Sequence, residues 1–366
     1  METALQAALV AGEIRHDAAA DAWRVTGFRI GREILAEADF RKPDFTPLAI
    51  GHLPRAIGLA VRRGEALQRL WTTPPPHPGW PVRRTFVAAF APRRLDFLRD
   101  GMRAEAERLL ASAGRDGFEL DRDFAVPFTQ WAVARVYGID SAEIDHVARM
   151  TEPLGAAFSF GERERMGAAM AMATIEPMLA ALLRAPARPG ATALETVQTE
   201  LAAGEIAEDE ALSWMALTLL AGLQTNRRFL VRWLAAANSR ADGTGEGGGL
   251  AVAAELTRLY VDVVTPARQN RRAFALDDVV IPEGSTFLLD LAEINHDPTR
   301  FSEPARFCPA RQDSGHLSFG YGAHMCVGRH LAMMQIDSVA RVLSLELRAS
   351  LARAARGKAL DGAGLH

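Results

Sequence analysis

The sequence predicts a mainly α-helical protein with a small β portion, and three observations carry that prediction. The middle of 205–234 is apolar on almost every side, which is typical of a helix that crosses a protein interior. Residues 327–347 also carry apolar side chains at helical spacing. Strand patterns are short, and the clearest is 279–291, where Pro282 and Gly284 supply a turn between two strands.

Composition and charge place the chain among ordinary globular proteins. It has 366 residues, of which 49% are hydrophobic and 24% charged, so it is long enough to bury a cofactor-sized pocket. The formal net charge of -3 and the lack of a basic stripe argue against nucleic-acid binding. Only Cys308 and Cys326 occur, so a disulfide framework is not expected and a reducing cytoplasm is predicted. The N-terminus lacks a signal-peptide pattern and no long apolar run stands out, so no membrane association is expected.

The first half of the chain gives coarser predictions. Residues 23–34 predict a strand and a turn that lead into a short helix, whereas the pattern from there to about 70 is weak. The following prolines predict an extended approach to a helix that begins near Trp80. Residues 118–183 have a helical pattern.

The most specific stretch is FGYGAHMCVG, residues 319–328, which places Cys326 in a glycine-rich loop. Gly320 and Gly322 let the backbone take turns that side chains would forbid. Helical spacing begins at Val327, so Cys326 is predicted at a helix N-terminus, where unpaired N–H groups favour a thiolate. A thiolate on a rigid loop is a suitable axial ligand for haem iron.

This stretch resembles the haem-thiolate signature of the cytochrome P-450 superfamily, F-G-x-G-x-H-x-C-x-G, with every fixed position filled. The resemblance implies a P-450 fold, with haem b between a long central helix and the Cys-loop plus its following helix. It implies one haem-thiolate domain over 1–366, weakly matched before about 70 and in the tail 348–366. The implied iron ligand is Cys326, and the other haem contacts implied in the motif are Phe319, Gly320, Gly328 and, at a haem propionate, His324.

The family's central helix carries alanine-glycine-x-acid-threonine, and this chain has Ala221, Gly222, Leu223, Gln224 and Thr225. The resemblance implies that Gly222 makes room beside the haem and that Thr225 holds dioxygen or water. Gln224 replaces the acid, and an amide cannot relay protons near neutral pH although it can position water. Three alternatives follow. Protons come through Thr225 together with ordered water or a substrate group, or the enzyme uses peroxide as its oxidant, or the reaction is not an ordinary hydroxylation.

Cations for the haem propionates are expected near residue 80 and after residue 260. Counting from Phe90 and Pro92 favours Arg83, whereas Trp80 with Arg84 fits the family's spacing one residue out of register. His77 would need a two-residue insertion, and Gly79 stands at the family's histidine position. Downstream, Arg268 aligns with the arginine that binds a propionate, with Arg271 as the alternative.

A Glu-x-x-Arg pair, Glu255 and Arg258, lies on one face of a predicted helix. The resemblance implies that the pair is buried with a third arginine, matched to Arg306, and that it anchors the loop that carries the cysteine. Such a buried network gives specificity and rigidity more than net stability.

The resemblance implies a monooxygenase of the soluble bacterial type that acts on a small organic substrate, in bacterial secondary metabolism. No flavin, nicotinamide or iron-sulfur motif occurs, so electrons are expected from a ferredoxin and its reductase. The alternatives are a peroxide-using or non-hydroxylating haem-thiolate enzyme, and a catalytically silent haem-binding module. The end of the chain lacks the family's usual pocket hairpin, so a carrier or partner protein can close the pocket.

Overall fold

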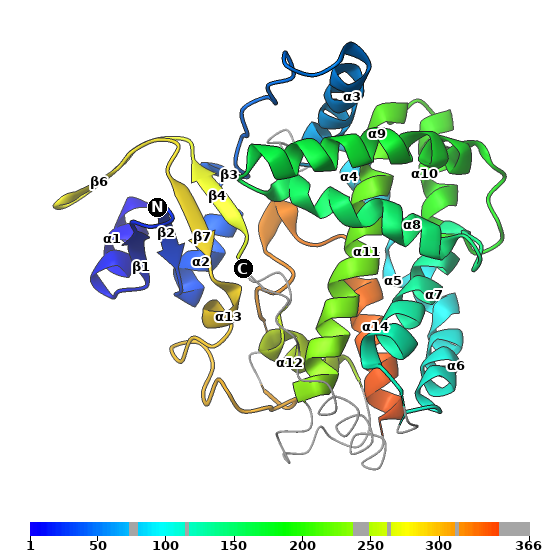
Figure 1. The fold of residues 1–366 in the computed structure, drawn as a ribbon. Coiled ribbons are helices and arrows are strands. Elements are labelled where there is room, and N and C mark those ends of the chain that lie inside the picture. The colour runs from blue at the N-terminus through cyan, green and yellow to red at the C-terminus, as the bar shows by residue number, and fades with distance from the viewer. Residues whose placement is uncertain (73–79, 114–116, 237–248, 262–264, 312–314, 344–366) are drawn as a thin grey trace.

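Helices make up most of the chain in the computed structural model, and the strands gather at one side (Figure 1). The structure describes residues 1–72, 80–113, 117–236, 249–261, 265–311 and 315–343. The α-helices are α1 (Glu2–Val10), α2 (Phe28–Ala36), α3 (Arg55–Thr72), α4 (Pro81–Ala89), α5 (Pro92–Leu95), α6 (Arg99–Leu110), α7 (Val126–Tyr137), α8 (Ile144–Thr151), α9 (Glu162–Arg184), α10 (Thr192–Ala202), α11 (Glu208–Ala236), α12 (Leu250–Leu259), α13 (Leu291–Ile294) and α14 (Arg329–Val342). Short helical turns of other types are η1 (Asp96–Leu98), η2 (Leu120–Ala125), η3 (Glu152–Phe158) and η4 (Gly322–His324). The predicted mainly α fold with a small β portion is confirmed.

A five-stranded sheet joins the start of the chain to a segment far along it. Its order is β1 (Ile14–Asp17), β2 (Ala22–Val25), β7 (Thr286–Leu289), β4 (Ala267–Asn270) and β3 (Phe40–Arg41). The β2–β7 pair is parallel and the other neighbours are antiparallel. The predicted strands on either side of Pro282 and Gly284 exist, but β6 (Val279–Ile281) pairs with β5 (Phe274–Leu276) and not with β7. The turn therefore connects two different sheets.

The long helix α11 crosses the middle of the helical portion and lies beside α14 (Figure 1). Three acidic residues in its first turn, Glu208, Asp209 and Glu210, favour a helix start there. Its buried residues face neighbours on several sides, as the apolar sequence predicts. The predicted helix near residue 80 is α4, which begins at Pro81 with Trp80 as its N-cap.

Helices α3 and α9 pack closely through a glycine. A Cβ atom at Gly64 of α3 would overlap the main chain of Ala169 in α9, so only glycine allows this approach. Leu48, Val61 and Ala169 form a small buried apolar cluster at the same contact. The weakly assigned tail 348–366, where the sequence predicts that the usual pocket hairpin is missing, lies outside the described residues.

Candidate active site

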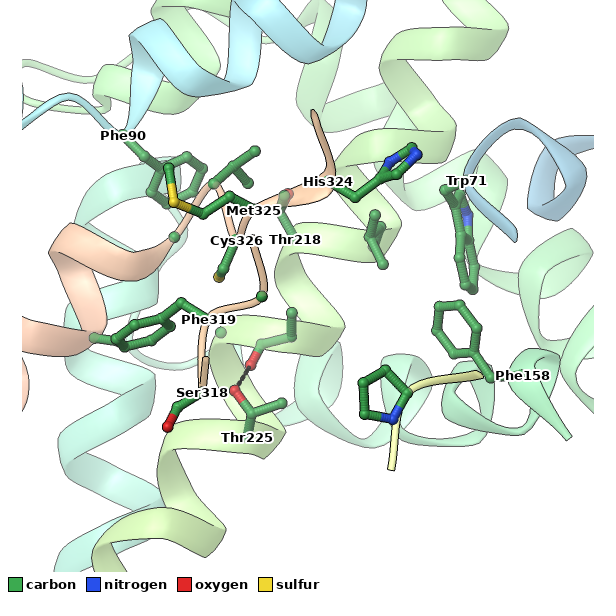
Figure 2. Close-up of a pocket in the computed structure, with 18 of the residues that line it drawn as sticks. Trp71, Phe90, Phe158, Thr218, Thr225, Ser318, Phe319, His324, Met325 and Cys326 are labelled. Atoms are coloured by element: carbon green, nitrogen blue, oxygen red, sulfur yellow. Dashed lines mark hydrogen bonds between the residues drawn. The ribbon is translucent and has the colours of Figure 1, made fainter. Parts of the chain in front are cut away.

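A cavity of about 570 Å³ lies between α11 and the loop that carries Cys326 (Figure 2). The other described parts of its wall include residues of α2, α3, α4, α7, α12, α13, β4 and α14, together with Lys42, Pro43, Phe45, Phe158 and Phe160. Most of the lining side chains are apolar, and none of the described ones is an aspartate or a glutamate. A volume of this size suits a cofactor or a small organic molecule.

The Cys326 loop has the backbone that its glycines allow. Gly320 and Gly322 both have φ of +70°, and a Cβ at Gly322 would lie 3.2 Å from the Cα of Ala36. The N–H of Cys326 donates to the carbonyl of Phe319 at 2.8 Å, which closes the loop just before α14. These contacts hold the Cys326 side chain at the cavity wall.

The thiol of Cys326 has a raised pKa. Burial raises the pKa, and this outweighs the N–H of Gly328 and the cations Arg83 and Arg329, which lower it. Burial and the helix start therefore act in opposite directions on this thiol. A metal ion bound at the sulfur would deprotonate it outright.

Gly222 and Thr225 of α11 line the cavity, but Gln224 does not. Thr225 donates its hydroxyl to the carbonyl of Ala221 at 2.7 Å. Gln224 is 9% exposed and accepts a hydrogen bond of 3.4 Å from Arg227, which pairs with Asp121. One residue along a helix turns the side chain by about 100°. The prediction that Gln224 acts in the pocket is therefore wrong, because it points toward η2.

Four basic side chains, Lys42, Arg83, Arg268 and His324, line one part of the cavity. Burial, with the charges of Arg268 and Arg83, lowers the pKa of Lys42 to about 7. Burial also lowers the pKa of Arg268 to about 10, and burial with Lys42 and the two arginines lowers that of His324 to about 4. Within the described chain none of the four is ion-paired with a carboxylate.

Of the predicted residues near 80, Arg83 faces the site. Its guanidinium donates to the carbonyl of Met325 at 2.5 Å, next to Cys326. Trp80 lines the cavity, but its indole N–H donates to Glu210 at 2.7 Å. Arg84 is exposed and does not line the cavity. The prediction that Arg84 contacts the haem is therefore wrong, and the neighbouring residue Arg83 faces the cavity instead. The alternatives His77 and Gly79 lie outside the described residues.

Arg268 is buried beside the cavity, whereas Arg271 is exposed at the end of β4. Arg268 donates to the carbonyl of Ala267 at 2.8 Å. Lys42 was missed by sequence reasoning, because it follows β3 in a segment with little pattern. Its ammonium donates to the carbonyl of Trp71 at 2.8 Å.

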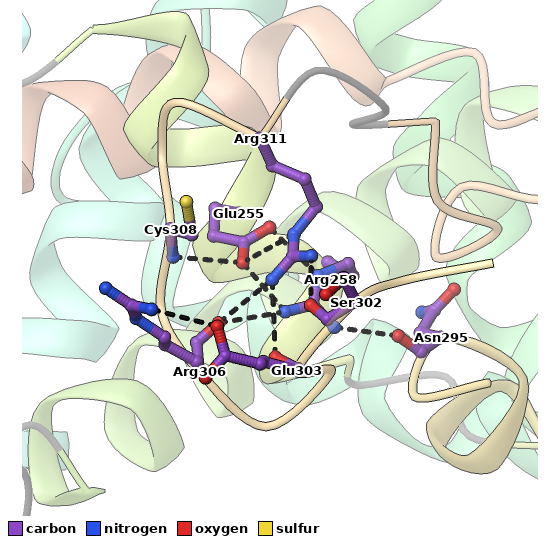
Figure 3. A network of polar contacts seen from close by, with 8 residues as sticks. All are labelled: Glu255, Arg258, Asn295, Ser302, Glu303, Arg306, Cys308 and Arg311. Carbon is purple, nitrogen blue, oxygen red and sulfur yellow. Dashed lines mark hydrogen bonds and ion pairs between the residues drawn. The ribbon is translucent and has the colours of Figure 1, made fainter. Parts of the chain in front are cut away.

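The Glu255–Arg258 pair is buried, with side chains 2% and 0% exposed (Figure 3). Arg258 donates to both carboxylate oxygens at 2.9 and 2.7 Å and to the carbonyl of Asn295 at 2.8 Å. Burial alone would raise the pKa of Glu255. The hydrogen bonds and charge of Arg258, the N–H of Cys308 and the charge of Arg311 outweigh burial, so the pKa of Glu255 is lowered. The carboxylate is thus stabilised in its charged form.

The third arginine of this network is Arg311, which corrects the prediction of Arg306. Arg311 is 9% exposed and places its Nε 3.3 Å from Glu255 (Figure 3). The Arg306 side chain is 64% exposed and pairs with Glu303, and Arg306 joins the network through its carbonyl. A five-residue shift along an irregular loop separates the two arginines, and sequence spacing cannot resolve it.

Asn295 connects this network to the Cys326 loop. Its side chain accepts from the N–H of Leu317 at 2.9 Å and donates to the Ser318 hydroxyl at 2.8 Å. Ser318 in turn donates to the carbonyl of Thr257 in α12 at 2.8 Å. Sequence reasoning missed Asn295 and Ser318, since neither residue type in such a position signals a role.

The described residues hold no cluster of three or more His, Cys, Asp or Glu side chains suited to a metal ion. By length and composition alone α9 could cross a membrane, whereas the sequence predicts no membrane association. The core helix of a soluble protein meets the same criteria.

Comparisons with known proteins agree with this arrangement. A family model described as Cytochrome P450 matches residues 250–343. "Cytochrome P450 107B1" of Saccharopolyspora erythraea is 27% identical over 88% of this chain and 81% of its own length. The "6-deoxyerythronolide B hydroxylase" of the same organism is 26% identical over 88% and 82%.

Solved structures give the same fold. The crystal structure of P450BioI in complex with an acyl carrier protein ligated to hexadec-9Z-enoic acid aligns with a TM-score of 0.71 at 20% identity. The alignment covers 88% of this chain and 84% of that one. Epothilone B-bound cytochrome P450epoK aligns with a TM-score of 0.73 at 18% identity, over 89% of this chain and 84% of that one. With its family motif, its fold and these relatives, the chain belongs to the cytochrome P450 superfamily.

Proposed function

We propose that the chain forms one domain that holds haem b in this cavity with Cys326 as the iron ligand, and that it is a monooxygenase. The observation that carries the proposal is that Cys326 and Thr225 line one cavity from two different elements. A haem held between them would have the cysteine on one side and the α11 hydroxyl on the other.

The basic residues of the cavity fit the two haem propionates. Arg83 and Arg268 supply two permanent positive charges, and His324 supplies ring nitrogens beside them. Without a negative partner, burying such charges is costly. Two carboxylates on the cofactor offset that cost, so we assign Arg83, Arg268 and His324 to the propionates.

A bound haem supplies the redox chemistry that inserts an oxygen atom into an organic substrate. The chain's residues prepare the site for it. The Phe319–Cys326 hydrogen bond fixes the cysteine, and the apolar wall excludes water. Thr225 Oγ1 donates to Ala221 and keeps its lone pairs for a hydrogen bond from water, so this atom can hold a water that would supply a proton.

The substrate and partners are proposed from the relatives. Relatives named as macrolide-type hydroxylases support a small organic substrate in bacterial secondary metabolism. We expect electrons from a ferredoxin and its reductase, and action in the cytoplasm. The complex of P450BioI with an acyl carrier protein makes a carrier-bound substrate a further possibility for this chain.

The ferrous carbon-monoxide spectrum tests the iron ligand. We expect a shifted, thiolate-type Soret band in the wild type and in Cys308→Ser, whose cysteine lies beside Glu255 and away from the cavity. Cys326→Ser should lose the band. A Cys326→Ser protein that retains the shifted band would refute the assignment.

Peroxide use is a second candidate, because no described lining residue is a carboxylate and Gln224 points away from the cavity. Hydrogen peroxide already carries the electrons that the ferredoxin would supply and the protons that an acid relay would deliver. Product formed with peroxide should be compared with product formed with ferredoxin, its reductase and oxygen. Product with peroxide alone would favour this candidate, and product with the ferredoxin system alone would exclude it.

A further inference from the structure

The described wall of the cavity carries three lysine or arginine side chains, one more than the two propionates of a haem. Lys42, Arg83 and Arg268 line the cavity, and within the described chain none of them is ion-paired with a carboxylate. The haem assigned above brings two propionates. Two propionates balance two cations, so a third anion is needed to balance the remaining charge.

Of the three cations, Lys42 is the one that contacts Trp71 and Phe158. Its ammonium is 5.7 Å from the centroid of the Phe158 ring, and Phe158 is 44% exposed. The rings of Trp71 and Phe158 lie 5.0 Å apart, at the side of the cavity away from Cys326 (Figure 2). Arg83, in contrast, is held at the Met325 carbonyl next to Cys326. Lys42 therefore joins the basic cluster of the cavity to its Trp71–Phe158 end, where we place the substrate.

Lys42 also has unused hydrogen-bonding capacity. An ammonium group has three donors, and among the described residues Lys42 bonds only to the Trp71 carbonyl. The surrounding wall of Pro43, Phe45, Trp71 and Phe158 offers no negative charge. The lowered pKa of Lys42 agrees with a cation that lacks a counter-ion.

We propose that Lys42 binds the carboxylate of an organic-acid substrate, which makes this residue a determinant of specificity. The proposal rests on the haem site described above. The carboxylate binds the ammonium at the Trp71–Phe158 end, and the apolar body of the acid extends along the wall toward Thr225 and the haem. Neutral analogues of the same shape lose this ion pair.

Matched pairs of probes test the proposal on the haem-loaded protein. Dodecanoate and its methyl ester, and biphenyl-4-carboxylate and its amide, are titrated by the substrate-induced shift of the Soret band and by calorimetry. We expect the wild type to bind at least one acid about 10-fold or more tightly than its neutral partner, as a charged hydrogen-bonded pair allows. A wild type without any such preference overturns the proposal.

Three variants locate the effect. Lys42→Met should lose about 10-fold in affinity for the acid and leave the ester or amide unchanged. Lys42→Arg should retain the preference for the acid. Arg62→Met, which removes an exposed charge from α3 outside the cavity, is the matched control and should behave as the wild type.

The rate of haem transfer to apomyoglobin separates this role from cofactor binding. We expect equal rates for Lys42→Met and the wild type. Faster haem loss together with an unchanged preference for acids would assign Lys42 to a propionate and overturn the proposal. A wild type that shows the thiolate carbon-monoxide band but no preference for acids contradicts only this inference, whereas a missing band contradicts the haem site itself.

Discussion

The buried network around Glu255 gives the sharpest prediction, because sequence and structure name different arginines. Arg311→Ala removes a side chain that is 9% exposed and that bonds to Glu255 and to the carbonyls of Ser302 and Arg306, at 3.3, 2.6 and 3.2 Å. Breaking a buried ion pair typically costs about 3–5 kcal/mol. Glu255 keeps Arg258 as a partner in this variant, so we expect the free energy of unfolding to fall by the low end of that range, about 3 kcal/mol.

Arg306→Ala is the matched control. Its guanidinium is 64% exposed and pairs with Glu303, and an exposed ion pair is worth about 0.2–1 kcal/mol. The contribution of Arg306 to the network is its carbonyl, which the substitution keeps. We therefore expect a loss below about 1 kcal/mol.

Urea unfolding followed by tryptophan fluorescence measures both variants, with the haem content of the purified proteins as a second readout. Arg311→Ala should shift the unfolding midpoint to lower urea and release haem faster, because the network also bonds through Asn295 to the Cys326 loop. An equal or larger loss in Arg306→Ala would refute the reasoning and restore the sequence-based choice.

Three further predictions concern charge and proton delivery. The lowered pKa of Glu255 means that its charge stabilises the fold above about pH 4.5, so the stability gap between wild type and Glu255→Gln should narrow as unfolding is measured at lower pH. In haem-free protein the pKa of Lys42, lowered from 10.5 to about 7, penalises its charge, so Lys42→Met should be about 2–4 kcal/mol more stable than wild type below pH 7. This difference in stability between Lys42→Met and the wild type should vanish by pH 10.5. A difference that stays constant with pH, in thermal or urea unfolding, would contradict the prediction. Thr225→Ala should lower the product formed per reductant consumed by about 10-fold or more, whereas Gln224→Glu, which would face Arg227, should change it less than about threefold.

Local patterns explain what could be predicted from the sequence. The Cys326 loop depends on glycines whose backbone angles are fixed within ten residues, and α11 depends on a long apolar run. Glu255 and Arg258 are three residues apart in one helix, so their pairing follows from helix geometry. These features need no knowledge of distant parts of the chain.

Contacts between distant segments explain what could not be predicted. The choice between Arg83 and Arg84 depends on the helical phase of α4, and one residue decides whether a side chain faces the cavity or the solvent. The prediction for Gln224 is wrong for the same reason, because the helical phase of α11 turns its side chain away from the cavity. Lys42 reaches the site only because β3 pairs with β4, more than 200 residues away along the chain, next to Arg268.

The Gly64 contact limits how α3 and α9 can move relative to each other. Trp71 lies on α3, and Phe158 and Phe160 lie in the segment that leads into α9, so α3 and that segment border this end of the cavity. The backbones of α3 and α9 touch at Gly64, which leaves no side-chain layer over which one helix could slide on the other. A larger residue at position 64 would therefore force α3 and α9 apart and shift Trp71 relative to Phe158.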